Sequence, residues 1–187
     1  MWPWGHLAVG YLSYSLGARW RDASLRGHEA LAVAFGTQFP DLVDKPLGWD
    51  LALLPSGRSL AHSLITALVV IAIVVAIARR FDRERVAWVF SLGYLSHLAA
   101  DGFQPFVLGQ FEFLTYLGWP LLPLPPYENE SRSIVEHLLA LDWSTFFAIE
   151  LGITAIAITV WVYDGMPGLF TVTDLLGLTN RKRESTD

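Results

Sequence analysis

Histidines and aspartates in this chain stand at spacings that suit a metal site. His97 and Asp101 are four residues apart, so a helix would place both side chains on one face. Arg58 and His62 share that spacing. Imidazole and carboxylate together suit zinc, and also manganese or iron. Since the chain has no cysteine, disulfides and thiolate chemistry are excluded, and any metal must be held by His, Asp or Glu.

No single pair is specific, because a His-x-x-x-Asp pair also fits a hydrogen-bonded pair at a wet helix end. A histidine among aromatic residues is more often interfacial than a ligand. A metal site therefore requires that these residues come together in the folded chain. The expected metal ligands are His6, Asp41, His62, His97 and Asp101. Asp44 is expected to orient a histidine or to act as general base, and Arg58 to face a phosphate oxygen.

Later residues supply an additional candidate group. Arg132 could bind a phosphate, and Glu136 and His137 could complete the site from a short helix. The alternative for the last two is a solvated helix face. His28 falls on the opposite, basic side of the expected topology and is excluded from the site.

The elements that must position these residues are membrane helices. Of the 187 residues 53% are hydrophobic, and the mean hydropathy is +0.40. A formal charge of −5 without a basic patch argues against nucleic acid as a partner and leaves membrane lipids. Eight tryptophans and six tyrosines fit interfacial aromatic belts. We expect a single all-α domain over 1–179 and a disordered cytoplasmic tail over 180–187.

Apolar runs predict about five membrane spans, since a bilayer core of about 30 Å needs about 20 helical residues. The expected spans are 7–18, 30–40, 59–78, 86–100 and 146–163. The second should end before Pro40, because the residue preceding a proline disfavours helix. Prolines between 102 and 143 predict a long irregular loop that holds one short amphipathic helix over 131–141.

Positive charges set the orientation. Ten of the 13 Lys and Arg residues fall in the first loop, in the loop after the third span, or in the tail. Those segments should be cytoplasmic. All the expected ligands then meet at the extracytoplasmic face, although they played no part in choosing the topology. That convergence predicts a multi-pass protein of the cell membrane with an active site facing outward.

Four motifs carry a resemblance to a known family. They are Trp4-Gly5-His6, Phe39-Pro40-Asp41-Leu42-Val43-Asp44, Arg58-Ser59-Leu60-Ala61-His62 and Gly93-Tyr94-Leu95-Ser96-His97-Leu98-Ala99-Ala100-Asp101. Residues 4–102 thereby resemble the membrane-bound, metal-dependent hydrolases typified by YdjM, with a remote similarity to zinc-dependent phospholipases C. The resemblance implies a helical hydrolase with a metal centre and a phosphoester substrate. The sequence departs from the family pattern at the third motif. There Gly57 and Ala61 replace the family's usual histidine and threonine.

The leading hypothesis is hydrolysis of a phosphoester or lipid phosphoester by metal-activated water, with one or two ions and Asp41 and Asp101 as bridging ligands. A transporter of metal ions or protons is the first alternative, although transporters usually bind near the bilayer midplane. A catalytically inactive scaffold that keeps the metal for stability is the second.

Overall fold

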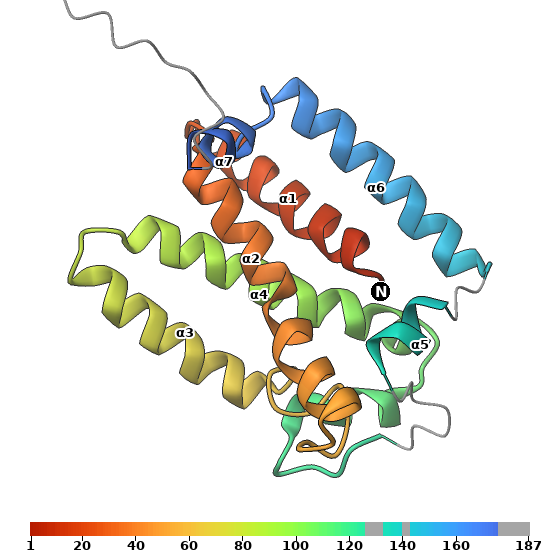
Figure 1. Ribbon diagram of the computed structural model, residues 1–187. Helices are drawn as coiled ribbons and strands as arrows, with labels where there is room; N and C mark the ends of the chain where they lie inside the picture. Colours follow the sequence, from red (N-terminus) through yellow and green to blue (C-terminus); the bar gives the residue numbers. More distant parts are fainter. Residues whose placement is uncertain (126–132, 140–142, 176–187) are drawn as a thin grey trace, which may run out of the picture.

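The computed structural model describes residues 1–125, 133–139 and 143–175, and this part of the chain is helical throughout, without a strand (Figure 1). Its elements are α1 Pro3–Trp20, α2 Gly27–Lys45, the π-helical turn η1 Pro46–Asp50, α3 Leu64–Arg79, α4 Glu84–Val107, the 3-10 helix η2 Phe111–Gly118, α5 Ile134–Leu139, α6 Thr145–Tyr163 and α7 Leu169–Leu175. The predicted all-α class is confirmed. The predicted tail, 180–187, lies outside the described residues.

Two apolar helices match the predicted spans best. Among the described helices, α6 alone is both long and apolar enough to cross a membrane by itself, and α3 is apolar but shorter. Ser144 caps α6 by accepting a hydrogen bond from the Phe147 amide at 3.2 Å. How many of the remaining helices cross the bilayer stays a prediction.

The predicted start of the third span at Ser59 is wrong. Helix α3 begins only at Leu64, after Ser63 has capped it through the amide of Ile65. The preceding residues are not helical because their amides bind elsewhere. Ser59 and Ala61 donate to the carboxylate of Asp44 at 2.9 and 2.8 Å.

Two helices run further than predicted. Helix α2 continues through Pro40 to Lys45, since Pro40 is fully buried and tertiary packing overrides the local preference of its neighbour. Helix α4 continues past Asp101 to Val107 and contains Pro105. A proline so near the C-terminus removes only the hydrogen bond to the carbonyl four residues earlier.

The centre of the bundle is the close contact of α2 with α4, and α1 packs on both (Figure 1). A Cβ at Gly36 would lie 2.2 Å from the Phe90 carbonyl oxygen, and one at Gly93 would lie 2.4 Å from that of Val33. Backbone therefore meets backbone at this crossing. Tyr94 is fully buried beside it. The crossing fixes the separation of the two helices that carry Asp41 and His97.

Helix α6 packs mainly on α1 and is bound to it at both ends. Glu150 accepts a hydrogen bond from the Trp2 amide at 2.7 Å. Asp164 accepts from the hydroxyls of Tyr11 and Ser15, each at 2.7 Å. These polar contacts orient α6, whose other faces are largely exposed.

We predict that Gly93→Ala destabilises the protein, because the added methyl would meet main-chain atoms that cannot rotate away. Overpacking of this kind costs about 1–3 kcal/mol. Gly152→Ala on α6 is the matched control, since nothing lies within 4 Å of its added Cβ. Thermal unfolding in detergent should show a lower Tm for Gly93→Ala and an unchanged or higher Tm for the control. Equal values would contradict the close contact.

Candidate metal centre

Four potential ligand atoms face one another where α2, α4 and the 51–63 connection meet. Nε2 of His62 lies 3.1 Å from Nε2 of His97. The Asp41 Oδ1 atom lies 3.4 and 3.8 Å from these two nitrogens. The Asp101 Oδ2 atom lies 3.7 and 3.8 Å from them. Ligands at about 2.0–2.1 Å from a tetrahedral zinc are about 3.3 Å apart, so these separations suit a first-row metal.

His6 approaches the same group from α1. Its ring stacks on that of His97, with centroids 3.7 Å apart, and its Nε2 lies 3.3 Å from Asp101 Oδ1. Both ring nitrogens of His6 are buried without a hydrogen bond. The two oxygens of Asp101 therefore face different histidines. A carboxylate in that position can bind one ion or join two.

Neighbouring groups fix the orientation of two histidines. Nδ1 of His97 lies 2.6 Å from the Thr37 carbonyl oxygen, which can only accept, so this nitrogen donates. Nδ1 of His62 lies 2.9 Å from Asp44 Oδ2. Both imidazoles thus turn Nε2 toward the common centre. Such support of the ring nitrogen remote from the metal is typical of metal-bound histidine.

The His62 environment attracts positive charge. Burial disfavours the charged ring and lowers its pKa, but hydrogen bonds to Asp41 and Asp44, with the nearby Asp101 charge, outweigh burial, and the pKa is raised. The centre therefore has an excess of acceptor groups around Nε2, where a cation would be stabilised.

Basic side chains already contact the carboxylates. Lys45 is buried, with Nζ 2.6 Å from Asp41 Oδ2, and Arg58 Nε lies 3.1 Å from Asp101 Oδ2. The nitrogen of Met1 lies 2.8 Å from Asp101 Oδ1. The Arg58 side chain is 33% exposed, whereas the Asp101 side chain is almost completely buried. Arg58 is thus the charged group at the rim of the centre.

Buried histidine nitrogens and aspartate oxygens, which are suitable metal ligands, therefore surround a common point. Two sets offer ligand atoms that all lie within 4.8 Å of one another. These sets are His6, Asp41 and His97, and His62, His97 and Asp101. The five residues predicted as ligands are brought together and could hold a metal ion. The assignment of individual residues among these five as metal ligands stays a prediction.

Comparison with known proteins identifies the family of the chain. Residues 1–170 match the family described as YdjM inner membrane protein. The chain belongs to the YdjM inner membrane protein family. Neither a curated protein nor a solved structure matches it. Membership confirms the resemblance to YdjM and the membrane location. The predicted similarity to phospholipases C stays a prediction.

One departure from the YdjM-like motif has a structural explanation. A Cβ at Gly57 would lie 2.3 Å from Nε1 of the Trp49 indole, so a histidine cannot be placed there beside this tryptophan. At the other departure, the Ala61 amide donates to Asp44 and its carbonyl accepts from the Tyr94 hydroxyl at 2.6 Å. The main chain of Ala61 therefore still supports the centre.

Two residues near the candidate centre were missed by sequence reasoning. Lys45 is not among the predicted site residues, although its spacing of four from Asp41 is visible in the sequence. Glu150 lies within the apolar α6 and gave no local indication of its position. Its carboxylate accepts a hydrogen bond from the Trp2 amide. The same carboxylate lies against Gly5, where an added Cβ would be 2.4 Å from Oε1 of Glu150. Glu150 thereby holds the start of α1, and with it His6.

The structure describes the remaining candidates only in part. Arg132 lies outside the described residues, and so does the side chain of His137, whose helix α5 packs against η1. Glu136 is exposed, and its amide donates to the Ser133 hydroxyl at 3.1 Å. His28 is exposed at the start of α2, far along that helix from Asp41.

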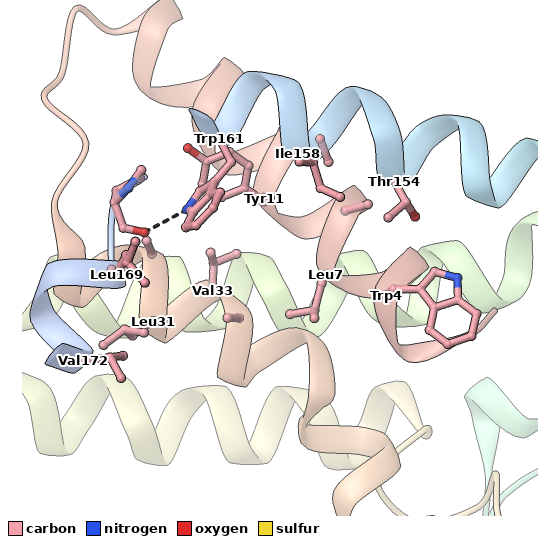
Figure 2. A pocket seen from close by; sticks show the side chains of 16 residues that line it. Trp4, Leu7, Tyr11, Leu31, Val33, Thr154, Ile158, Trp161, Leu169 and Val172 are labelled. Atoms are coloured by element: carbon pink, nitrogen blue, oxygen red, sulfur yellow. Dashed lines mark hydrogen bonds between the residues drawn. The ribbon is translucent and has the colours of Figure 1, made fainter. Parts of the chain in front are cut away.

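A cavity of about 510 Å³ on another side of α1 offers no comparable chemistry. It lies between α1, α2, α6 and α7 and is lined mainly by apolar side chains such as Val33 and Ile158 (Figure 2). Trp161 borders it and donates from Nε1 to the Pro167 carbonyl at 3.0 Å. No histidine or carboxylate lines this cavity within the described chain.

We predict that Asp44→Asn weakens metal binding by about 10–100-fold, the usual effect of losing support behind a ligand. The amide nitrogen would face backbone donors, and one support of His62 would be weakened. Asp22→Asn is the control, because Asp22 is exposed and asparagine tolerates its positive φ of 49°. Competition with a chromophoric chelator measures the affinity. An unchanged affinity in Asp44→Asn would contradict the orienting role.

Gly5→Ala should weaken metal binding about tenfold or more, because the methyl displaces Glu150 from the start of α1 and shifts His6. Gly17→Ala on the same helix is the control, since its Cβ would meet nothing within 4 Å. The same chelator competition applies, with Tm measured alongside. If both variants bind metal alike, Glu150 does not position His6.

Proposed function

We propose that this protein is a membrane-bound, metal-dependent hydrolase of a phosphoester or lipid phosphoester. The observation that carries the proposal is the group of four ligand atoms from His62, His97, Asp41 and Asp101. The distance between the two histidine nitrogens, and those from each nitrogen to the two aspartate oxygens, are 3.1–3.8 Å. Zinc is the proposed metal, with manganese or iron as alternatives, because the donors are nitrogen and oxygen. One or two ions fit the donor set.

A bound divalent metal would supply water with a pKa near 7, a nucleophile at neutral pH. Arg58 would bind the phosphate oxygens, because its guanidinium lies at the rim and presents a planar set of donors. Lys45 holds one oxygen of Asp41, which leaves the other directed at the histidines. These residues would orient the ester and stabilise the charge that develops on it.

Asp44 is better suited to orienting His62 than to acting as a general base. Its carboxylate is fully buried and accepts from the amides of Ser59, Ala61 and His62 as well as from the His62 ring. A base must reach water or substrate, and these four contacts leave little room for either.

We also propose about five spans, with the centre toward the extracytoplasmic face, from the distribution of Lys and Arg. Outward-facing apolar residues on α3 support this arrangement. Leu68, Val69, Ile73 and Ile77 are each more than half exposed. Such a surface would be costly in water and is favourable in lipid.

An inactive scaffold is the second candidate, and a specific observation favours it. Lys45 and Arg58 already form ion pairs with Asp41 and Asp101, so both carboxylates have cationic partners without a metal ion. Transport has less support, because α3 offers no ionisable residue before Arg79 and the candidate ligands form one compact group.

We predict that His97→Ala loses bound metal and phosphoester hydrolysis together, because His97 belongs to both candidate ligand sets. His28→Ala is the matched control, since that histidine is exposed and remote. Metal content of the purified protein is measured by mass spectrometry, and turnover on phosphomonoesters, phosphodiesters and phospholipids.

Metal retained by wild type without turnover on any ester would favour the scaffold. Metal uptake into sealed vesicles that depends on His97 would favour transport. Equal metal content in His97→Ala and wild type would contradict the site itself.

A further inference from the structure

A cavity of about 540 Å³ adjoins the candidate metal centre, within the range of small-molecule sites. One part of its lining is charged and includes Arg58, Asp101 and Glu150. Asp101 and Arg58 also belong to the candidate centre, so the cavity meets the centre at these residues. A ligand in the cavity would therefore place a polar group beside the proposed reacting position.

The rest of the lining is mainly apolar. It comes from α4, from α6 and from η2, and includes Phe103, Phe113, Phe146, Ile149 and Ile153. Phe103 is 59% exposed and Ile149 is 51% exposed, so apolar side chains continue from the cavity to the protein surface. Because α6 packs mainly on α1, close helix packing does not seal the side between α6 and α4.

We infer that this cavity binds a membrane amphiphile, with an anionic phosphate headgroup beside Arg58 and an apolar chain along Ile149 and Ile153. The identity of the headgroup as the reacting group rests on the proposed function. Arg58 supports the polar end, since its guanidinium lines the cavity, is one-third exposed and has several donors, so it can bind a phosphate oxygen as well as Asp101. A small water-soluble ester would leave the aromatic and aliphatic wall without a partner. An amphiphile covers both parts and can enter from the lipid.

The test uses the full chain in phosphatidylcholine nanodiscs and an alkyl phosphate whose chain ends in a photoreactive diazirine. Labelling should map to the lining of α6 and η2, and unlabelled alkyl phosphate should compete better than inorganic phosphate. Ile149→Trp should weaken labelling at least about tenfold, because the larger side chain fills the mouth of the cavity.

Ile156→Trp is the matched control. Ile156 lies seven residues from Ile149, so it is on nearly the same face of α6, and at 58% exposure it lines no described cavity. Labelling in this variant should equal that of wild type. Equal labelling in both variants, or label spread along the outer face of α6, overturns the inference.

Hydrolysis provides a separate readout. Labelling in the cavity that Ile149→Trp abolishes supports amphiphile binding even if no ester is hydrolysed, an outcome that rejects only the proposed function. Equal hydrolysis of alkyl phosphate and a short soluble ester, both unaffected by Ile149→Trp, keeps the hydrolase but rejects the amphiphile.

Discussion

The buried carboxylate of Asp44 connects the end of α2 to the segment that precedes α3. It accepts hydrogen bonds from the backbone amides of Ser59, Ala61 and His62 and contacts the His62 ring. A buried carboxylate is costly unless it is saturated with donors, and these four contacts supply them. One interaction thus determines where α3 begins, keeps residues 59–62 out of the helix and turns His62 toward His97. The candidate centre depends on it.

The crossing of α2 and α4 supplies the second constraint. Gly36 and Gly93 let the two backbones touch, and Thr37, beside Gly36, presents the carbonyl that orients His97. Packing and chemistry therefore share the same few turns of helix. Helix α1 is placed less directly, since Glu150 of α6 holds its first turn. Among the candidate metal ligands, His6 is therefore the one positioned by a residue far away in the sequence, Glu150.

Much of the centre could be predicted from the sequence, because the ligands stand at local spacings near the ends of apolar helices, and the structure brings these ends together. The contacts between distant segments could not. Nothing near Pro40 shows that burial will carry α2 onward to Lys45, and nothing around Glu150 shows that α6 returns to Trp2. The bounds of α3 were mispredicted for the same reason, since Asp44 lies 15 residues from Ser59. Helix α5 packs against η1, another contact between distant segments that the local sequence does not indicate.

Trp49 and Gly57 occupy one volume, since an added Cβ at residue 57 would meet the indole ring. Lys45 lies over the same indole, with Nζ 5.4 Å from its centroid. The side chains allowed at these three positions therefore depend on one another. A relative that carries histidine in place of Gly57 needs a smaller or differently directed residue in place of Trp49, and its lysine then loses an aromatic neighbour. The volume that a side chain at residue 57 would need is filled in this chain by the indole of Trp49.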